Sequence, residues 1–167
     1  MKHSVITFLI AIMITTIGYS QKLDKTKQNI ISSVENHKQE IIEISDQIWE
    51  LAELAFNEYE SSKILSDYAK KNGFTVEKGV AGMPTAFVAT YGSGKPVISV
   101  LGEFDALRGL SQTTTSKKNP LVVGGSGHGC GHNMFGAASL ASAIAIKEQI
   151  ENGDLKGTIK FFGTPSE

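Results

Sequence analysis

The sequence has 167 residues, of which 41% are hydrophobic and 20% are charged, and its formal net charge is −1. This composition is typical of a soluble globular protein, and the length fits one ordinary domain. The basic residues form no stripe, because Lys70-Lys71 and Lys117-Lys118 are isolated pairs. The charge distribution therefore argues against a nucleic-acid partner.

Residues 1–20 have the pattern of a secretory signal peptide. A basic start precedes an apolar run at 5–17, and small residues flank the tyrosine in 18–20. A membrane anchor usually needs about 18 or more apolar residues, so a cleaved signal is the better interpretation. We expect cleavage before Gln21, which predicts an exported protein, periplasmic or secreted, with no membrane segment after cleavage.

Two amphipathic helices are predicted at 24–55 and 61–72, because apolar residues recur there at spacings of three and four. Gly73 stands where a left-handed cap would end the second helix. Aromatic side chains at helical spacing usually pack in a core. We therefore expect core packing for the three aromatic residues of this region, Trp49, Phe56 and Tyr59.

Short β-branched runs at 85–91 and 97–101 predict neighbouring strands, and the second is so apolar that we expect burial on both faces. A polar surface loop is predicted at 111–120. An alanine-rich helix at 133–150 and a strand at 158–162 follow it. This order of elements predicts an α/β fold, with a mixed sheet flanked by helices.

In such sheets the chemistry lies beyond the carboxyl ends of the strands. Three polar motifs are expected there, at 102–105, 127–133 and 163–167. The central one, Gly-His128-Gly-Cys130-Gly-His132-Asn133, contains the chain's only cysteine. Cysteine thiolate and imidazole are ligands that Zn²⁺ and similar ions accept, and the start of a helix favours the thiolate. The motif therefore predicts a metal site.

Other catalytic motifs fit the same residues less well. The glycine-rich loop fails the G-x-S-x-G nucleophile elbow, because His128 stands at its final position, and it contains no dinucleotide-binding fingerprint. A cysteine nucleophile remains open, with Cys130 attacking and His128 or His132 as its base. That chemistry leaves the carboxylates at the other two strand ends unexplained.

Together, the segments LGEFDAL at 101–107, GHGCGHN at 127–133 and GTPSE at 163–167 resemble the M20 family of metallopeptidases and amidohydrolases. The particular similarity is to its branch of p-aminobenzoyl-glutamate and amino-acid-conjugate hydrolases. The resemblance implies a zinc-peptidase-like catalytic domain with two divalent metal ions, zinc or manganese, and a homo-oligomeric complete protein.

Carried over by position, the resemblance implies a role for each matching residue. Cys130 and His132 match metal ligands, and Glu167 matches the general base of the reaction. Asp105 and His128 match positions that support the ligands. Glu103 lies where the family varies and receives no role.

The resemblance further implies that residues 21–167 are the amino-terminal part of the catalytic domain, truncated, without the smaller dimerisation domain. We expect this segment alone to be inactive and poorly soluble, because its last strand would expose an apolar edge. The expected substrates are N-acyl amino acids or peptide-like conjugates, with p-aminobenzoyl-glutamate as one candidate. A carboxypeptidase or dipeptidase activity and an inactive binding module remain alternatives.

Overall fold

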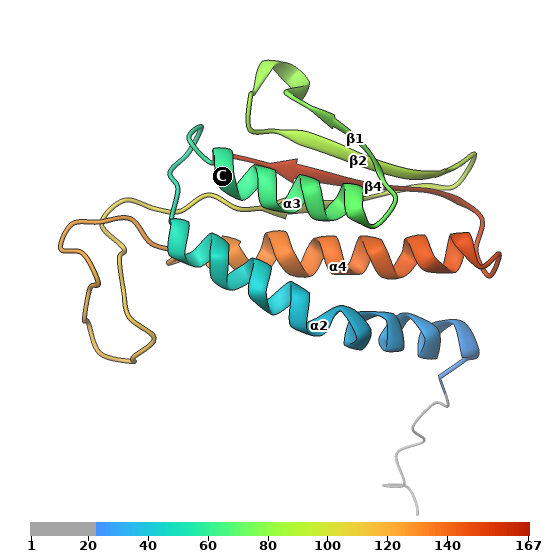
Figure 1. The fold of residues 1–167 in the computed structure, drawn as a ribbon, viewed down its shortest axis with the longest axis horizontal. Helices are drawn as coiled ribbons and strands as arrows, with labels where there is room; N and C mark the ends of the chain where they lie inside the picture. Colours follow the sequence, from blue (N-terminus) through green and yellow to red (C-terminus); the bar gives the residue numbers. More distant parts are fainter. Residues whose placement is uncertain (1–22) are drawn as a thin grey trace, which may run out of the picture.

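The computed structural model of the protein describes residues 23–167 (Figure 1). The predicted signal peptide, and with it the prediction of export, lies outside these residues. Within residues 23–167, no helix combines the length and the apolar character needed to cross a bilayer.

Within the described residues, three α-helices form where the apolar periodicity predicts them. Helix α2 spans Lys25–Leu51, α3 spans Tyr59–Lys71 and α4 spans His132–Glu151. The Asp24 carboxylate caps α2 by accepting a backbone hydrogen bond from its first turn. The helix ends at Ala52, whose φ of 42° is left-handed and whose N–H still donates to a carbonyl of the last turn.

Four strands form one mixed sheet in the order β1-β2-β4-β3, in which β3 and β4 are parallel and the other pairs antiparallel. Their bounds are Thr75–Lys78 for β1, Phe87–Ser93 for β2, Val97–Glu103 for β3 and Gly157–Thr164 for β4. A short 3-10 turn at Val80–Gly82 joins β1 to β2. The predicted α/β class is therefore confirmed, although β1, which is short and mostly exposed, was not predicted.

Helices α3 and α4 cover the same face of the sheet (Figure 1). Ala89 and Phe161 are cross-strand partners and point to one face. They share one buried cluster with Leu65 of α3 and Ile144 of α4. Helix α2 adds Ile48 to this cluster from the outer side of α4.

The prediction that residues 97–101 are buried on both faces is wrong. Strand β3 lies at the edge of the sheet, and Val97, Ile98 and Leu101 are 52%, 55% and 61% exposed. The exposure follows from its place, because within residues 23–167 strand β3 has one neighbouring strand and the helices cover one face of the sheet. The strand predicted to present the open edge, β4, instead lies between β2 and β3. The prediction that 85–91 and 97–101 are neighbouring strands is therefore also wrong, because β4 separates them.

The prediction of core packing for the aromatic residues is wrong at two positions. Phe56 and Tyr59 are 53% and 56% exposed. They lie where the chain turns from α2 into α3, and Phe56 adopts a left-handed φ of 61°. Helical periodicity does not continue through that turn, so it could not predict which way these rings point. Trp49 is half-buried.

Candidate active site

The predicted site residues gather around the carboxyl ends of the parallel strands β3 and β4 and the start of α4. Glu103 ends β3, and Asp105 follows it. His132 is the first residue of α4, which follows Gly131 at the N-cap. Gly131 has a φ of 80°, a left-handed conformation that glycine adopts without strain. Glu167 lies three residues beyond β4.

Two glycines let α4 approach the end of β3 closely. A Cβ atom on Gly136 of α4 would lie 2.8 Å from the carbonyl oxygen of Glu103. On the strand, a Cβ on Gly102 would lie 3.3 Å from the Cα of Gly136 and 2.6 Å from the ring of Phe161. This close packing, about one helical turn from His132, brings the imidazole to the carboxylates that follow β3.

Replacing Gly136 by alanine tests this close packing. Alanine is favoured over glycine in a helix by about 1 kcal/mol, whereas overpacking a tight contact costs about 1–3 kcal/mol. We expect the steric cost to win and the free energy of unfolding to fall by up to about 2 kcal/mol. Denaturant unfolding, with the far-ultraviolet circular dichroism as the signal, measures it.

The control for this substitution is Ala138→Gly, at an exposed position of the same helix. It reports the helix-propensity effect alone, and we expect a loss of about 1 kcal/mol. A Gly136→Ala variant more stable than the wild type would contradict the close approach of α4 to β3.

His132 is buried between two carboxylates. Its Nδ1 lies 2.7 Å from Oδ1 of Asp105, and its Nε2 lies 3.0 Å from Oε2 of Glu103. Asp105 is 2% exposed and His132 is 5% exposed. A buried carboxylate that accepts a hydrogen bond from Nδ1–H fixes the ring and its tautomer. The opposite nitrogen, Nε2, is then the one that can bind a cation, and the Glu103 carboxylate faces it.

Cys130 is exposed, two residues before His132 in the glycine loop. The thiol, the imidazole and the nearby carboxylates are a donor set that suits a divalent ion of the zinc type. In the described part of the chain, however, no three His, Cys, Asp or Glu side chains lie close enough to hold an ion together. The ligand roles of Cys130 and His132 and the catalytic role of Glu167 therefore stay predictions.

His128 joins the glycine loop to the end of α2. Its Nε2 lies 2.9 Å from the carbonyl oxygen of Ile48. Burial lowers the pKa of His128, an effect only partly opposed by the hydrogen bond to Ile48. A neutral ring that donates from Nε2 satisfies the carbonyl. The ring positions the loop that carries Cys130, and its Nε2 is not directed to the thiol.

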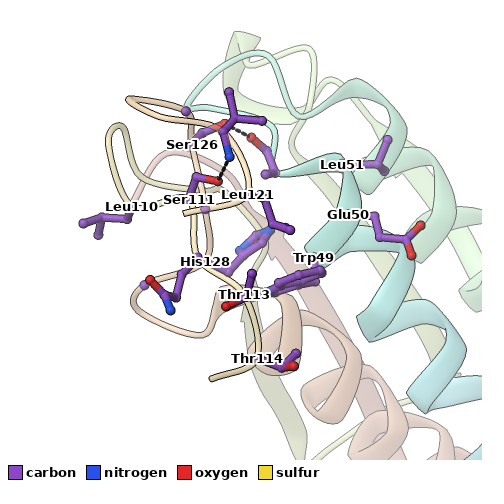
Figure 2. Close-up of a pocket in the computed structure, with 16 residues that line it drawn as sticks. Trp49, Glu50, Leu51, Leu110, Ser111, Thr113, Thr114, Leu121, Ser126 and His128 are labelled. Carbon is purple, nitrogen blue, oxygen red and sulfur yellow. Dashed lines mark hydrogen bonds between the residues drawn. The ribbon is translucent and has the colours of Figure 1, made fainter. Parts of the chain in front are cut away.

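A cavity of about 520 Å³ lies beside His128, between the end of α2 and the loop before α4. Figure 2 shows the His128 ring next to Trp49, with Thr113 and Leu121 close by. Ser126 and Ala52 both line the cavity, and the Ser126 hydroxyl donates to the carbonyl oxygen of Ala52 at 2.6 Å. The walls thus combine an indole ring and aliphatic side chains with several hydroxyl groups.

Known proteins similar to this chain identify its family. The chain is 43% identical over 139 residues to a subunit of p-aminobenzoyl-glutamate hydrolase from Escherichia coli K12, a match covering 83% of this chain. It is 35% identical over 130 residues to thermostable carboxypeptidase 1 of Saccharolobus solfataricus, covering 76% of this chain. Its fold matches a dinuclear metal-binding peptidase of the M20 family from Bacillus subtilis, with a TM-score of 0.66 and 25% identity over 80% of this chain. This segment belongs to the M20 family. No protein-family model matches the chain.

The M20 segment spans about a third of the length of these relatives. The matches cover 29% of the Escherichia coli protein, 32% of the carboxypeptidase and 36% of the Bacillus subtilis chain.

The structure shows contacts or burial for two carboxylates of this M20 segment to which the sequence assigned no role, Glu103 and Glu58. Glu103 ends strand β3, and a polar residue at a strand end is a recognisable signal, but its contact with His132 could not be predicted from the sequence. Glu58 belongs to no motif and lies in a turn between helices, yet it is fully buried. Nothing in its local sequence distinguishes it from the exposed glutamates nearby.

Proposed function

We propose that the protein containing this segment is a metal-dependent amidohydrolase, which cleaves the amide bond of N-acyl amino acids or peptide-like conjugates. The observation that carries the proposal is the buried pair of Asp105 and His132, joined at 2.7 Å beside the carboxylate of Glu103. Membership of the M20 family supports the same reaction, since two curated relatives are named as a hydrolase and a carboxypeptidase.

In this proposal, Cys130 and Nε2 of His132 would hold a divalent metal ion, and Asp105 holds the His132 ring in the required tautomer. A zinc or manganese ion held there would polarise the scissile carbonyl and would lower the pKa of water. Both proposed ligands lie at the start of α4, with Cys130 in the loop before it and His132 as its first residue.

Glu167 is the proposed general base. Its carboxylate takes a proton from the attacking water, whose oxygen bonds to the carbonyl carbon. Glu167 then returns the proton to the amide nitrogen as the carbon–nitrogen bond breaks. The products are a carboxylic acid and a free amino group, so the reaction consumes one water and no other reactant.

The finer substrate proposal is an aromatic N-acyl amino acid, with p-aminobenzoyl-glutamate as the first compound to test. Support comes from the name of the Escherichia coli relative and from the cavity beside His128. Trp49 and Leu121 offer apolar surface to a ring, and hydroxyl groups such as that of Thr113 offer hydrogen bonds to its substituents. The proposed setting is outside the cytoplasm, with a homo-oligomeric complete protein.

Metal removal tests the proposed function. The protein, expressed from its complete coding sequence, should hydrolyse p-aminobenzoyl-glutamate faster than N-acetyl-glutamate. Chelation should abolish turnover, because the carbonyl and the water are no longer activated, and Zn²⁺ or Mn²⁺ should restore it. Release of p-aminobenzoate and of free glutamate measures the reaction.

Two results would contradict this function. Turnover that survives chelation but stops when Cys130 is alkylated would indicate a cysteine nucleophile. Metal-loaded protein that hydrolyses no N-acyl amino acid or dipeptide would indicate a binding module.

A further inference from the structure

Glu58 is a fully buried glutamate whose carboxylate is not needed to cap its own helix. It is the N-cap residue of α3, a position where a short polar side chain usually accepts from the first free N–H groups, but the Glu58 carboxylate makes no such bond. Here Glu53 accepts instead, from the backbone N–H groups of Glu60 and Ser61 at 3.1 and 2.8 Å. Glu53 thus caps α3 from the preceding turn, and the Glu58 side chain is free for another contact.

The Glu58 carboxylate joins two segments of the sheet at the end that carries the candidate site. Its Oε2 accepts a hydrogen bond from Oγ1 of Thr85 at 3.0 Å, just before β2. Its Oε1 accepts from the backbone N–H of Ser166 at 3.1 Å, just after β4. These segments are neighbours because β2 and β4 are antiparallel, with Phe87 opposite Gly163.

Ser166 has an unusual backbone conformation. Its φ is 61°, in the left-handed region that a residue with a Cβ atom rarely adopts without support. The hydrogen bond from its N–H to Glu58 is such support, because it holds the peptide between Pro165 and Ser166 in one orientation. The next residue is Glu167, so the conformation at Ser166 sets the direction of the Glu167 side chain.

We infer that Glu58 is a positioning residue, which anchors the backbone N–H of Ser166 and thereby directs the Glu167 carboxylate to the reacting water. The inference rests on the proposed function of Glu167. Glu58 acts through the backbone and touches neither substrate nor metal. Its required property is a hydrogen-bond acceptor at the right distance, so a neutral acceptor of the same length should serve.

A pair of substitutions of similar size separates the acceptor from the space it fills. Glu58→Met keeps the length of the side chain but accepts no hydrogen bond from Ser166. Glu58→Gln keeps an acceptor oxygen, and its amide group can donate to the Thr85 hydroxyl. Both variants are made in the protein from the complete coding sequence, and kcat, KM, bound metal and Tm are measured with p-aminobenzoyl-glutamate as the probe.

We expect Glu58→Met to lower kcat by about 10–10²-fold, because a small displacement of a catalytic group has effects of that size, while KM and bound metal stay unchanged. Glu58→Gln should restore kcat to within about threefold of the wild type, since it keeps the hydrogen bond. The control is Ser62→Ala, which removes another buried hydrogen bond from α3 to Thr85, one of 2.7 Å. It should lower Tm and leave kcat unchanged.

Glu58→Met with wild-type kcat would overturn the inference, and so would a Glu58→Gln variant as slow as Glu58→Met. A fall in kcat for Ser62→Ala equal to that for Glu58→Met would show a general structural effect and would overturn it too. If Glu58→Met does not fold, Glu58→Asp replaces it, because the shorter side chain withdraws the acceptor from Ser166. Failure of the proposed function is a separate result, in which Glu167→Gln turns over substrate as fast as the wild type.

Discussion

Replacing Glu167 by glutamine is expected to lower kcat by about 10²–10⁴-fold, the usual contribution of a general base. The amide has the shape of the carboxylate but cannot accept the proton of the attacking water. Metal bound by Cys130 and His132 should remain, because Glu167 is not among the proposed ligands. Elemental analysis of the purified variant beside its steady-state kinetics measures both quantities.

The matched control is Glu77→Gln, the same chemical change at an exposed position of β1. It should leave both kcat and bound metal unchanged. Two outcomes would contradict the assignment of Glu167. A variant with wild-type kcat would mean that another group takes the proton, and a variant that loses its metal would mean that Glu167 is a ligand.

Local periodicity was sufficient to predict the principal elements of the fold. The helices at Lys25–Leu51 and His132–Glu151 and the strands at Phe87–Ser93 and Gly157–Thr164 lie close to their predicted positions. Each is long enough for its pattern of apolar residues to dominate. Strand β1, with four residues and a mostly exposed surface, carries no such pattern.

Burial could not be predicted in the same way, because it depends on topology. The apolar run at 97–101 resembles a central strand, but β3 has β4 as its one neighbour, and Leu101 is 61% exposed. Which strand forms an edge is decided by the order β1-β2-β4-β3. That order follows from contacts between distant segments, which a local pattern does not encode.

In the candidate site, too, some residues could be predicted from local motifs and others could be found only from the fold. The motifs predicted which residues gather at the strand ends, and Asp105 and His132, 27 positions apart in the sequence, do form a hydrogen bond. The contact of Glu58 with Ser166 joins residues 108 positions apart, and only one of them belongs to a motif. Residues that support a site through the backbone carry no special chemistry, so the fold is needed to find them.

Replacing Cys130 by alanine is expected to remove bound metal and activity together. The proposed site has one thiolate, and its loss removes the strongest soft donor for an ion of the zinc type. Substituting a group that only supports a metal ligand typically lowers metal affinity or activity by about 10–100-fold. Loss of a ligand itself should therefore lower the metal affinity by at least about 10²-fold. Equilibrium dialysis with Zn²⁺ measures the affinity, and hydrolysis of p-aminobenzoyl-glutamate measures the activity.

Cys130 is the only cysteine among the 167 residues and its side chain is exposed. A thiol-reactive dye therefore measures directly how reactive this thiol is. A thiolate bound to metal should react slowly, and chelation should make it react fast, since the exposed side chain is then free. Should Cys130→Ala retain its full metal content and still fail to turn over substrate, the thiol would be the nucleophile rather than a ligand. The base would then have to be His128 through its Nδ1, which makes no hydrogen bond within residues 23–167, because His132 has carboxylates at both ring nitrogens.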